Sequence, residues 1–168
     1  MREGTISILY GAHSIIHSYY VWKAWKILYK KYPSIKETIC IIVHDLGYFG
    51  MNYYSEKSNA GHAELGANIA EFLFGEEYKN LILGHSGSSC KKFNLKRSKL
   101  ERPDEYSWLI APLWWIKWTA KIEKYITPAE EFIEMVRRDF FKPEEEWQSG
   151  TDRSNKYREN IRNLNDNS

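Results

Sequence analysis

The chain has 168 residues, of which 43% are hydrophobic and 27% are charged, and its formal net charge is +2. This length predicts a single domain, residues 1–168, whose core is large enough to fold without disulfides. The two cysteines, Cys40 and Cys90, are too few for a secreted disulfide scaffold. The small net charge argues against binding of a nucleic-acid backbone, so we do not expect a nucleic-acid partner.

The longest apolar run, Trp108 to Ile116, is interrupted by Pro112 and is too short to span a membrane. The sequence also does not start with the charged and then apolar segments of a signal peptide. We therefore expect a soluble cytoplasmic protein that has no membrane partner.

The first predicted helix covers residues 11–32. Four of its residues recur at the spacing of one helix face: His17, Val21, Ala24 and Leu28. His17 is therefore predicted on the buried side of this helix, and His13 lies one turn earlier on nearly the same face.

The second predicted helix starts at Ser34 and ends near Leu46, before Gly47. Glu37 follows Ser34 at the spacing of a capping box. Residues 39–43 are apolar nearly all round, so this helix is predicted at the centre of the fold.

This helix delivers His44 and Asp45 to the interior, where a carboxylate without a positive partner would be costly. A metal ion bound by both side chains would remove that cost. A single His-Asp pair is nevertheless more often a structural histidine beside a capping aspartate, since one short motif match is weak. The other histidines therefore decide between the two interpretations.

A loop is predicted over residues 48–60, followed by a helix that starts at about Gly61. Its apolar side is predicted to consist of Leu65, Ile69, Phe72 and Leu73. His62 falls on the same side and is therefore predicted to face the core. A short helix over residues 76–85 follows and is closed by His85.

Residues 91–102 form a predicted basic loop with six lysines or arginines and one acid. Arg102-Pro103-Asp104 then has the composition of a helix start, which places Asp104 near an N-terminus. Another helix is predicted to start at Thr127, before a polar tail from about residue 143 with one short helix near residues 157–164. No β-type alternation is present, so the sequence predicts an all-α fold.

Four histidines lie at the ends or on the inward faces of four different predicted helices, and Asp104 opens a fifth. These histidines are His17, His44, His62 and His85. Imidazole and carboxylate together suit a divalent first-row transition ion (Mn, Fe, Co, Ni or Zn) better than Ca²⁺. Any one of these histidines is well explained as a structural core residue. Four such residues together are not, so we predict a metal site.

In this order, the residues resemble the H…HD…D signature of the HD-domain metal-dependent phosphohydrolases, in the subset that has two extra histidines and holds two metal ions. The matching residues are His17, His44, Asp45, His62, His85 and Asp104. The local sequence also resembles that of small HD proteins encoded by bacterial viruses, in the segment His44-Asp45-Leu46-Gly47-Tyr48-Phe49-Gly50. If the protein is encoded by such a virus, we expect it in the host cytoplasm. The resemblance implies an HD-type helical bundle of about six to eight helices, with a motif core at residues 11–126 and a C-terminal extension at residues 127–168.

The resemblance implies that His17, His44, Asp45 and Asp104 hold one ion. It also implies that Asp45 bridges to a second ion held by His62 and His85. His44 and Asp45 would then be the catalytic pair, while the two ions clamp a phosphate group and turn a shared water into hydroxide. For His13 we favour a role other than metal ligand, either orienting a ligand or lying at the surface.

Two positions depart from the family pattern. Tyr48 follows the His-Asp-x-Gly motif where members with a cyclic-dinucleotide activity often have lysine, and Glu105 follows Asp104 where many relatives have lysine. Phosphate contacts are therefore predicted from other cations, and contacts to a base from the aromatic loop after the His-Asp pair. The candidate substrate-binding residues are Tyr48, Lys57, Lys91, Lys92 and Arg97.

The leading interpretation is a phosphohydrolase that acts on a nucleotide. A first alternative is a phosphodiesterase that cleaves a cyclic or linear oligonucleotide signal, and a second is a non-catalytic, metal-containing nucleotide-binding protein. The expected partner is a small-molecule nucleotide or another phosphoester. The tryptophan-dense stretch from Trp108 to Trp118 is predicted to belong to the core. The alternative is that it forms the interface of a homodimer or higher homo-oligomer.

Overall fold

The computed structural model describes residues 5, 7–50, 56–124 and 128–141, without the side chains of residues 56–60. The described part contains eight α-helices, and its only β-type pairing is an isolated bridge between Thr5 and Phe49. The prediction of an all-α fold with six to eight helices is therefore confirmed. The predicted helix at residues 157–164 and the polar tail lie outside the described residues.

The helices are α1 (Ile15–Tyr29), α2 (Ile35–Val43), α3 (Glu56–Phe74), α4 (Glu76–Leu83), α5 (Gly87–Phe93), α6 (Glu101–Ile110), α7 (Leu113–Ile122) and α8 (Ala129–Phe140). A short 3₁₀ turn, η1 (Leu46–Tyr48), follows α2. No helix in the described ranges is both long enough and apolar enough to cross a bilayer.

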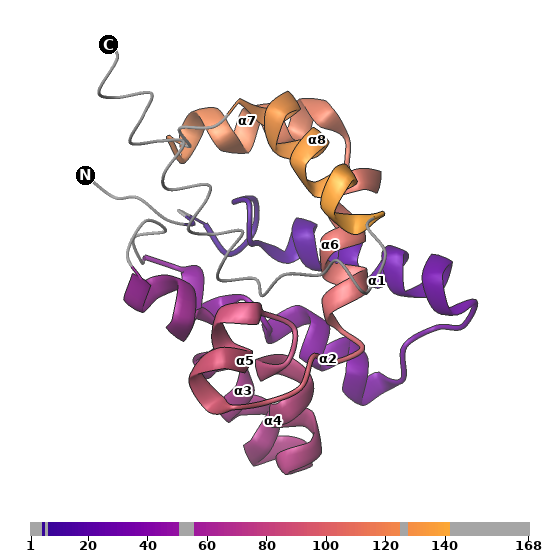
Figure 1. Ribbon diagram of the computed structural model, residues 1–168, viewed down its shortest axis with the longest axis vertical. Helices are drawn as coiled ribbons and strands as arrows, with labels where there is room; N and C mark the ends of the chain where they lie inside the picture. Colours follow the sequence, from indigo (N-terminus) through magenta and orange to yellow (C-terminus); the bar gives the residue numbers. More distant parts are fainter. Residues whose placement is uncertain (1–4, 6, 51–55, 125–127, 142–168) are drawn as a thin grey trace.

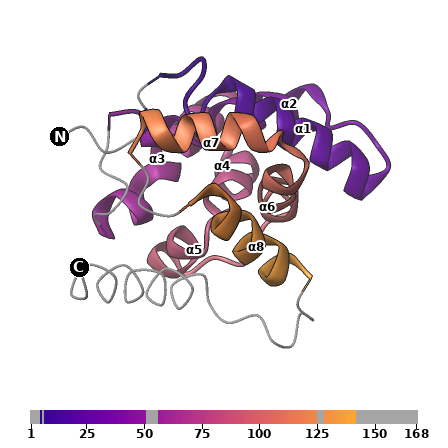
Figure 2. The same cartoon turned by 90° about the horizontal axis from the view of Figure 1, so that it is seen from above.

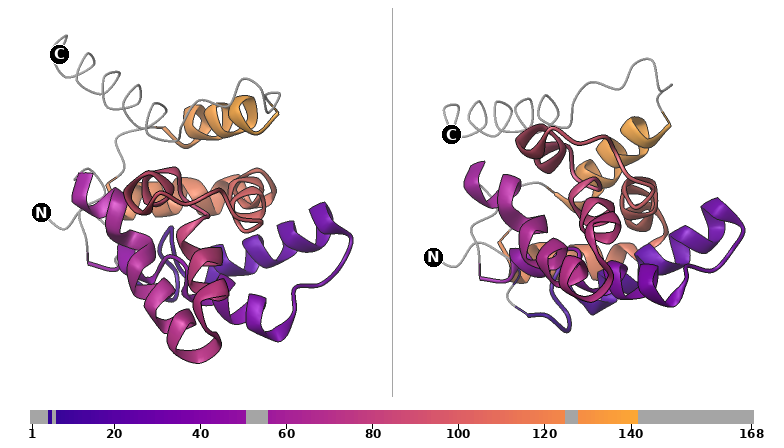
Figure 3. Two further views of the ribbon diagram at one scale, coloured as in Figure 1. Left: turned by 60° about the horizontal axis from the view of Figure 1, so that its bottom comes forward. Right: turned by 90° about the horizontal axis from the view of Figure 1, so that it is seen from below.

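The helices form two groups that meet along α1. Figure 1 shows α2, α3, α4 and α5 gathered in its lower half, α7 and α8 in its upper half, and α1 and α6 between them. Helix α1 packs on both α2 and α6, and α6 packs on α8. Figures 2 and 3 show α8 on the outer side of α6, opposite α1 and α2.

Each group has its own apolar cluster. The larger cluster joins α1, α2, α3 and α4, and includes the fully buried residues Val21, Trp25, Ile41, Ala67 and Ile82. The smaller cluster joins α7 and α8 to one side of α1 and is built on Trp115, Ile116 and Ala129. The predicted core role of the tryptophan-dense stretch therefore holds only in part, because Trp115 is buried whereas Trp114 is 71% and Trp118 is 42% exposed.

Helix α1 is shorter than the predicted helix over residues 11–32. It begins after Ser14, whose hydroxyl accepts a hydrogen bond from the backbone N–H of Ile16 and so caps the helix. It ends at Lys30, which adopts the left-handed conformation with φ of 55°. His13 consequently lies in the turn before α1, while His17 is buried on the predicted inner face.

Helix α2 begins with the predicted capping box. Ser34 accepts from the backbone N–H of Glu37, whose carboxylate accepts from the backbone N–H of Ser34. The predicted end near Leu46 is wrong, because the α-helix ends at Val43 and the chain then enters η1. His44 and Asp45 therefore lie at the helix end, where their side chains can turn towards neighbouring helices.

Helix α3 begins at Glu56, earlier than the predicted start near Gly61, and its buried face differs from the prediction. Leu65 and Leu73 are half exposed, and Phe72 is 89% exposed. The buried face consists instead of His62, Ala63, Gly66, Ala67 and Ala70. Small side chains on this face allow α3 to pack closely on α2 and α4.

The predicted basic loop over residues 91–102 is wrong at its start, because Lys91 and Lys92 belong to α5. Helix α6 begins at Glu101, with Asp104 in its first turn as predicted. Helix α8 begins close to the predicted position at Thr127. The termini of α4 and α6 thus bring His85 and Asp104 into the same part of the fold as the His-Asp pair.

Candidate metal centre

The six residues predicted as metal ligands lie together in the interior. They come from five helices or helix ends: His17 from α1, His44 and Asp45 from the end of α2, His62 from α3, His85 from the end of α4, and Asp104 from α6. Their ligand atoms fall into two groups that could each hold a metal ion, and Asp45 belongs to both groups. The prediction of a buried His/Asp cluster that could hold a metal ion is therefore confirmed.

The first group consists of His17, His44, Asp45 and Asp104. The Asp104 Oδ1 atom lies 2.9 Å from His17 Nε2 and 3.4 Å from His44 Nε2. The Asp45 Oδ2 atom lies 3.6 Å and 3.4 Å from the same two nitrogens. Two imidazole nitrogens and two carboxylate oxygens therefore face one point.

The second group consists of Asp45, His62 and His85. Here the other oxygen of Asp45, Oδ1, lies 3.7 Å from His62 Nε2 and 3.4 Å from His85 Nε2. The two imidazole nitrogens are 3.2 Å apart. One carboxylate thus turns one oxygen to each group.

Backbone carbonyls fix the tautomers of two histidines. His44 Nδ1 lies 2.7 Å from the carbonyl oxygen of Ile41, and His85 Nδ1 lies 2.5 Å from that of Ile82. A carbonyl only accepts, so Nδ1–H is the donor in each ring and a neutral ring carries its lone pair on Nε2. Nε2 of both rings therefore points at the cluster, where it is a lone-pair donor whenever the ring is neutral.

His17 is oriented by Ser107 in a similar way. The Ser107 hydroxyl donates to the backbone carbonyl of Asp104 at 2.6 Å, so its oxygen is the acceptor for His17 Nδ1–H at 3.4 Å. Burial lowers the pKa of His17 despite the nearby charge of Asp104. In this tautomer a neutral His17 ring presents its Nε2 lone pair to Asp104 Oδ1 at 2.9 Å, and a cation bound by both atoms would make this contact favourable.

Two buried polar atoms at the centre of the cluster have no hydrogen-bond partner among the described residues. They are His44 Nε2 and Asp45 Oδ1. Burial disfavours both carboxylate charges, but the neighbouring histidines outweigh burial and hold the pKa of Asp45 and of Asp104 well below the usual range. In the absence of a metal ion the histidines supply the positive charge that these carboxylates need, and, although burial disfavours the charged ring, the two carboxylates raise the pKa of His44 to about 9. A bound cation would take the place of these protons.

The distances within each group suit a bound transition ion. Donor atoms that lie about 2.0–2.2 Å from one ion are about 2.8–3.6 Å apart in tetrahedral or octahedral geometry. The distances between donor atoms in the two groups run from 2.9 to 3.7 Å. A cation bound here would also meet the orphaned atoms of His44 and Asp45, so the residues of the cluster could hold a metal ion.

Two glycines allow α3 to reach the His-Asp pair. A Cβ at Gly47 would lie 2.0 Å from the backbone oxygen of His62, and a Cβ at Gly66 would lie 2.1 Å from that of Val43. Contacts this close to backbone atoms leave no room for any side chain. Both glycines are thus required for His62 to approach Asp45.

Two aromatic rings, Trp108 and Tyr48, pack on histidines of the cluster. Trp108 stacks on His17 with ring centroids 4.7 Å apart, and Tyr48 stacks on His62 at 4.2 Å. Tyr48 also packs on His13, at 4.1 Å. Among the candidate substrate residues, Tyr48 is therefore placed directly beside the metal ligands.

The predicted cationic contacts lie elsewhere. Lys92 pairs with Glu64 on the surface of α3, and Arg97 pairs with Glu101. Lys91 is exposed on α5, and the side chain of Lys57 lies outside the described residues. Contact of these four residues with a substrate stays a prediction.

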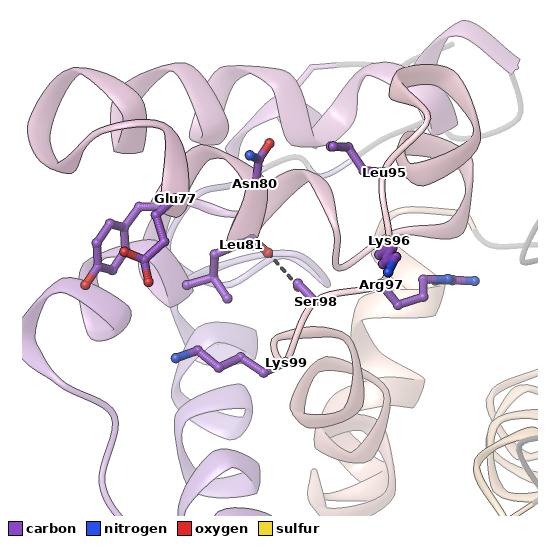
Figure 4. Close-up of a pocket in the computed structure, with 9 residues that line it drawn as sticks. Glu77, Asn80, Leu81, Leu95, Lys96, Arg97, Ser98 and Lys99 are labelled. Atoms are coloured by element: carbon purple, nitrogen blue, oxygen red, sulfur yellow. Dashed lines mark hydrogen bonds between the residues drawn. The ribbon is translucent and has the colours of Figure 1, made fainter.

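Arg97 borders a separate pocket of about 360 Å³ between α4 and residues 95–99. Ser98 closes one wall by donating to the backbone carbonyl of Leu81 at 2.7 Å. Figure 4 shows Arg97 and Lys99 extending in opposite directions from this wall. The pocket lining contains none of the six cluster residues, so it is distinct from the candidate metal centre.

Searches against protein-family models, curated proteins and solved structures gave no match to this chain. The helical fold and the buried His/Asp cluster are compatible with an HD-type site. Further assignment therefore rests on the geometry of the cluster itself.

Sequence reasoning left open the role of the residue that contacts the shared carboxylate most closely. His13 Nδ1 lies 2.6 Å from Asp45 Oδ2, although the residues are separated by more than thirty positions. The signal in the sequence was its place four residues before His17. Ser107 orients His17 and Trp108 stacks on it. Nothing in the sequence pointed to these two roles except that both residues follow Asp104 by about one helical turn.

Proposed function

We propose that this protein is a metal-dependent phosphohydrolase of the HD type that binds two divalent transition ions and hydrolyses a phosphate ester or anhydride bond of a nucleotide. Mn, Fe, Co and Ni suit the mixed imidazole and carboxylate ligands, and Zn is a further candidate. The order of the six ligands along the chain supports the HD type by resemblance.

The observation that carries the proposal is the orientation of Asp45. Its Oδ2 faces His17 and His44, and its Oδ1 faces His62 and His85. A carboxylate shared between two ligand groups is an arrangement that can hold two ions close enough to act on one phosphate group. A structural metal needs one closed group, whereas this cluster offers two joined groups.

When bound, such ions supply a nucleophile from water at neutral pH and neutralise the charge of the phosphate oxygens. The residues of the chain orient the ligand atoms and exclude bulk water. The backbone bonds of His44 and His85 hold both rings with Nε2 towards the centre. Burial of His44, whose side chain is 0% exposed, keeps bulk water from competing for these atoms.

The substrate would reach the cluster from the side of Asp104 and His13. Their side chains are 20% and 16% exposed, while the other cluster histidines are almost fully buried. Tyr48 and Trp108 lie beside this opening. An aromatic rim favours a nucleoside group over a bare sugar phosphate, since planar bases pack well on such rings.

The test is a product screen over nucleoside phosphates, cyclic nucleotides and short oligonucleotides with Mn²⁺ or Co²⁺, read by phosphate release and chromatography. We expect the native protein to convert one nucleotide class and Asp45→Ala to be inactive. Glu71→Ala is the matched control, because Glu71 is an exposed carboxylate on α3 that pairs only with Lys79 among the described residues.

Other results would redirect the assignment. A linear nucleotide product without free phosphate would identify a phosphodiesterase. Retention of metal and tight nucleotide binding without turnover would identify a binding protein. Equal activity of the native protein and Asp45→Ala would contradict the proposed role of the cluster.

A further inference from the structure

The closest polar contact to the shared carboxylate comes from outside both ligand groups. His13 Nδ1 lies 2.6 Å from Asp45 Oδ2. Two ligands from different residues on one ion stay about 2.8 Å apart or more, given metal–ligand distances of about 2.0–2.2 Å. The contact is therefore a hydrogen bond to Asp45, and His13 Nδ1 is not a ligand of the same ion.

The backbone at His13 is fixed from two directions. The backbone N–H of Ala12 donates to the buried carboxylate of Glu123, at the end of α7, at 3.1 Å. The backbone N–H of His13 donates to Thr5 Oγ1 at 3.3 Å. A Cβ at Gly11 would lie 2.9 Å from the backbone oxygen of Ser7 and 2.4 Å from Glu123 Oε1, so a side chain at this position would displace the turn.

The His13 ring is also held by its neighbours. Tyr48 packs on it at 4.1 Å, and Trp108 meets it edge-on at 5.6 Å. The same two rings stack on the ligands His62 and His17. The ring thus has little freedom to leave Asp45.

We propose that His13, held by the turn of residues 7–14 and by Glu123, is a positioning residue that sets the rotation of the Asp45 carboxylate. By donating to Oδ2, it keeps that oxygen towards His17 and His44, which leaves Oδ1 towards His62 and His85. Without this bond the carboxylate could rotate and serve one group alone. The inference rests on the proposed two-ion function, since only a bridging carboxylate needs a fixed rotation.

The test compares three substitutions at position 13. In His13→Asn the amide nitrogen takes the place of Nδ1, in His13→Gln it takes the place of Nε2, and His13→Leu removes the donor. Mn²⁺ stoichiometry and affinity are measured by titration calorimetry, and the electron paramagnetic resonance spectrum reports whether two Mn²⁺ ions are magnetically coupled.

We expect His13→Leu and His13→Gln to lose the coupled spectrum and to bind the second ion about 10- to 100-fold more weakly, as is typical for loss of a residue that orients a metal ligand. His13→Asn should restore both. Thermal unfolding of the metal-free variants, followed by circular dichroism, separates this effect from misfolding, because His13 is partly exposed and its loss should leave the fold intact.

A coupled pair of unchanged affinity in His13→Leu would overturn the inference while leaving the proposed function standing. Failure of His13→Asn to recover what His13→Leu loses would also overturn it. If the native protein binds fewer than two ions, the proposed two-ion function fails, and the inference fails with it.

Discussion

Asp45 is the residue on which both ligand groups depend, whereas each histidine serves one group. His62 contacts only the Oδ1 side of Asp45, together with His85, and His17 lies on the Oδ2 side. This division predicts different results for different ligand substitutions.

We predict that His62→Ala binds one Mn²⁺ per chain in place of two, because the group around His17 and Asp104 stays intact. Asp45→Asn should weaken both sites, since its amide nitrogen cannot act as a ligand. Calorimetric titration with Mn²⁺ measures both stoichiometries. Loss of both ions in His62→Ala would show that the two groups do not act as separate sites.

The sequence was informative about these residues because each ligand lies on a helix or at its end, where the chain pattern fixes the face. His17 could be placed from the 3.6-residue period, and Asp104 from the composition of a helix start. The sequence left open whether His13 orients a ligand or lies at the surface, and its partner Asp45 could not be identified, because a turn before a helix has no period that gives the direction of a side chain.

At the scale of elements, the approach of α3 to the end of α2 decides whether the second ligand group exists. Gly66 is in contact with the backbone of Val43, while a Cβ at Gly61 in the same helix would meet only the flexible Glu64 side chain, at 3.3 Å. These two glycines form a matched pair.

We predict that Gly66→Ala lowers the free energy of unfolding by about 1–3 kcal/mol, as overpacking of a tight contact does, and weakens the site at His62. Gly61→Ala should be neutral or stabilising by up to about 1 kcal/mol, because alanine favours helix. Urea unfolding and Mn²⁺ titration measure the two effects. Equal behaviour of the variants would contradict the close packing of α3 on α2.

The start of α2 carries a pH-dependent contribution to stability. Burial alone would raise the pKa of Glu37, but hydrogen bonds from Lys99 and Ser34 outweigh burial and lower it from its ordinary value of 4.5. Because the folded-state pKa is the lower one, the stabilisation is present above pH 4.5 and is lost as the pH falls through the folded-state pKa.

We predict that Glu37→Gln, which can still accept from the Ser34 backbone, unfolds about 0.5–1 kcal/mol more easily than the native protein near pH 7. The difference should shrink as the pH falls below 4.5. Urea unfolding across this pH range provides the measurement. A difference that stays constant with pH would rule out the charge of Glu37 as its source.

The elements themselves were only partly predictable. The capping box of α2 is a local pattern, so its position was correct. The predicted buried face of α3 was wrong. The helix buries Ala63, Ala67 and Ala70, because their small side chains allow close packing, and leaves the larger Leu65 and Phe72 exposed. Helix α5 was missed because its sequence is short and polar.

At the scale of the whole molecule, the cluster lies where the two helix groups meet, with ligands from α1 and α6 on one side and from α2, α3 and α4 on the other. The way in which these groups pack could not be predicted, because each contact joins residues far apart in the chain. The common chemistry of the histidines nevertheless indicated that their helices converge.

Metal bound at this junction should hold the two groups together. We predict that removal of metal with a chelator lowers the melting temperature and that Mn²⁺ at about 100 times its dissociation constant restores roughly 2.7 kcal/mol. For a chain of this length, this corresponds to a shift of roughly 5–10 °C. Differential scanning calorimetry measures the shift, and a melting temperature that does not respond to Mn²⁺ would contradict a metal at the junction.

The most direct test of the central claim, a two-ion centre bridged by Asp45, is anomalous diffraction at the manganese absorption edge from crystals grown with Mn²⁺. We predict two anomalous peaks, one against Asp45 Oδ2, His17, His44 and Asp104, and one against Asp45 Oδ1, His62 and His85. Absence of a peak from this cluster, with Mn²⁺ bound elsewhere or not at all, would contradict the account.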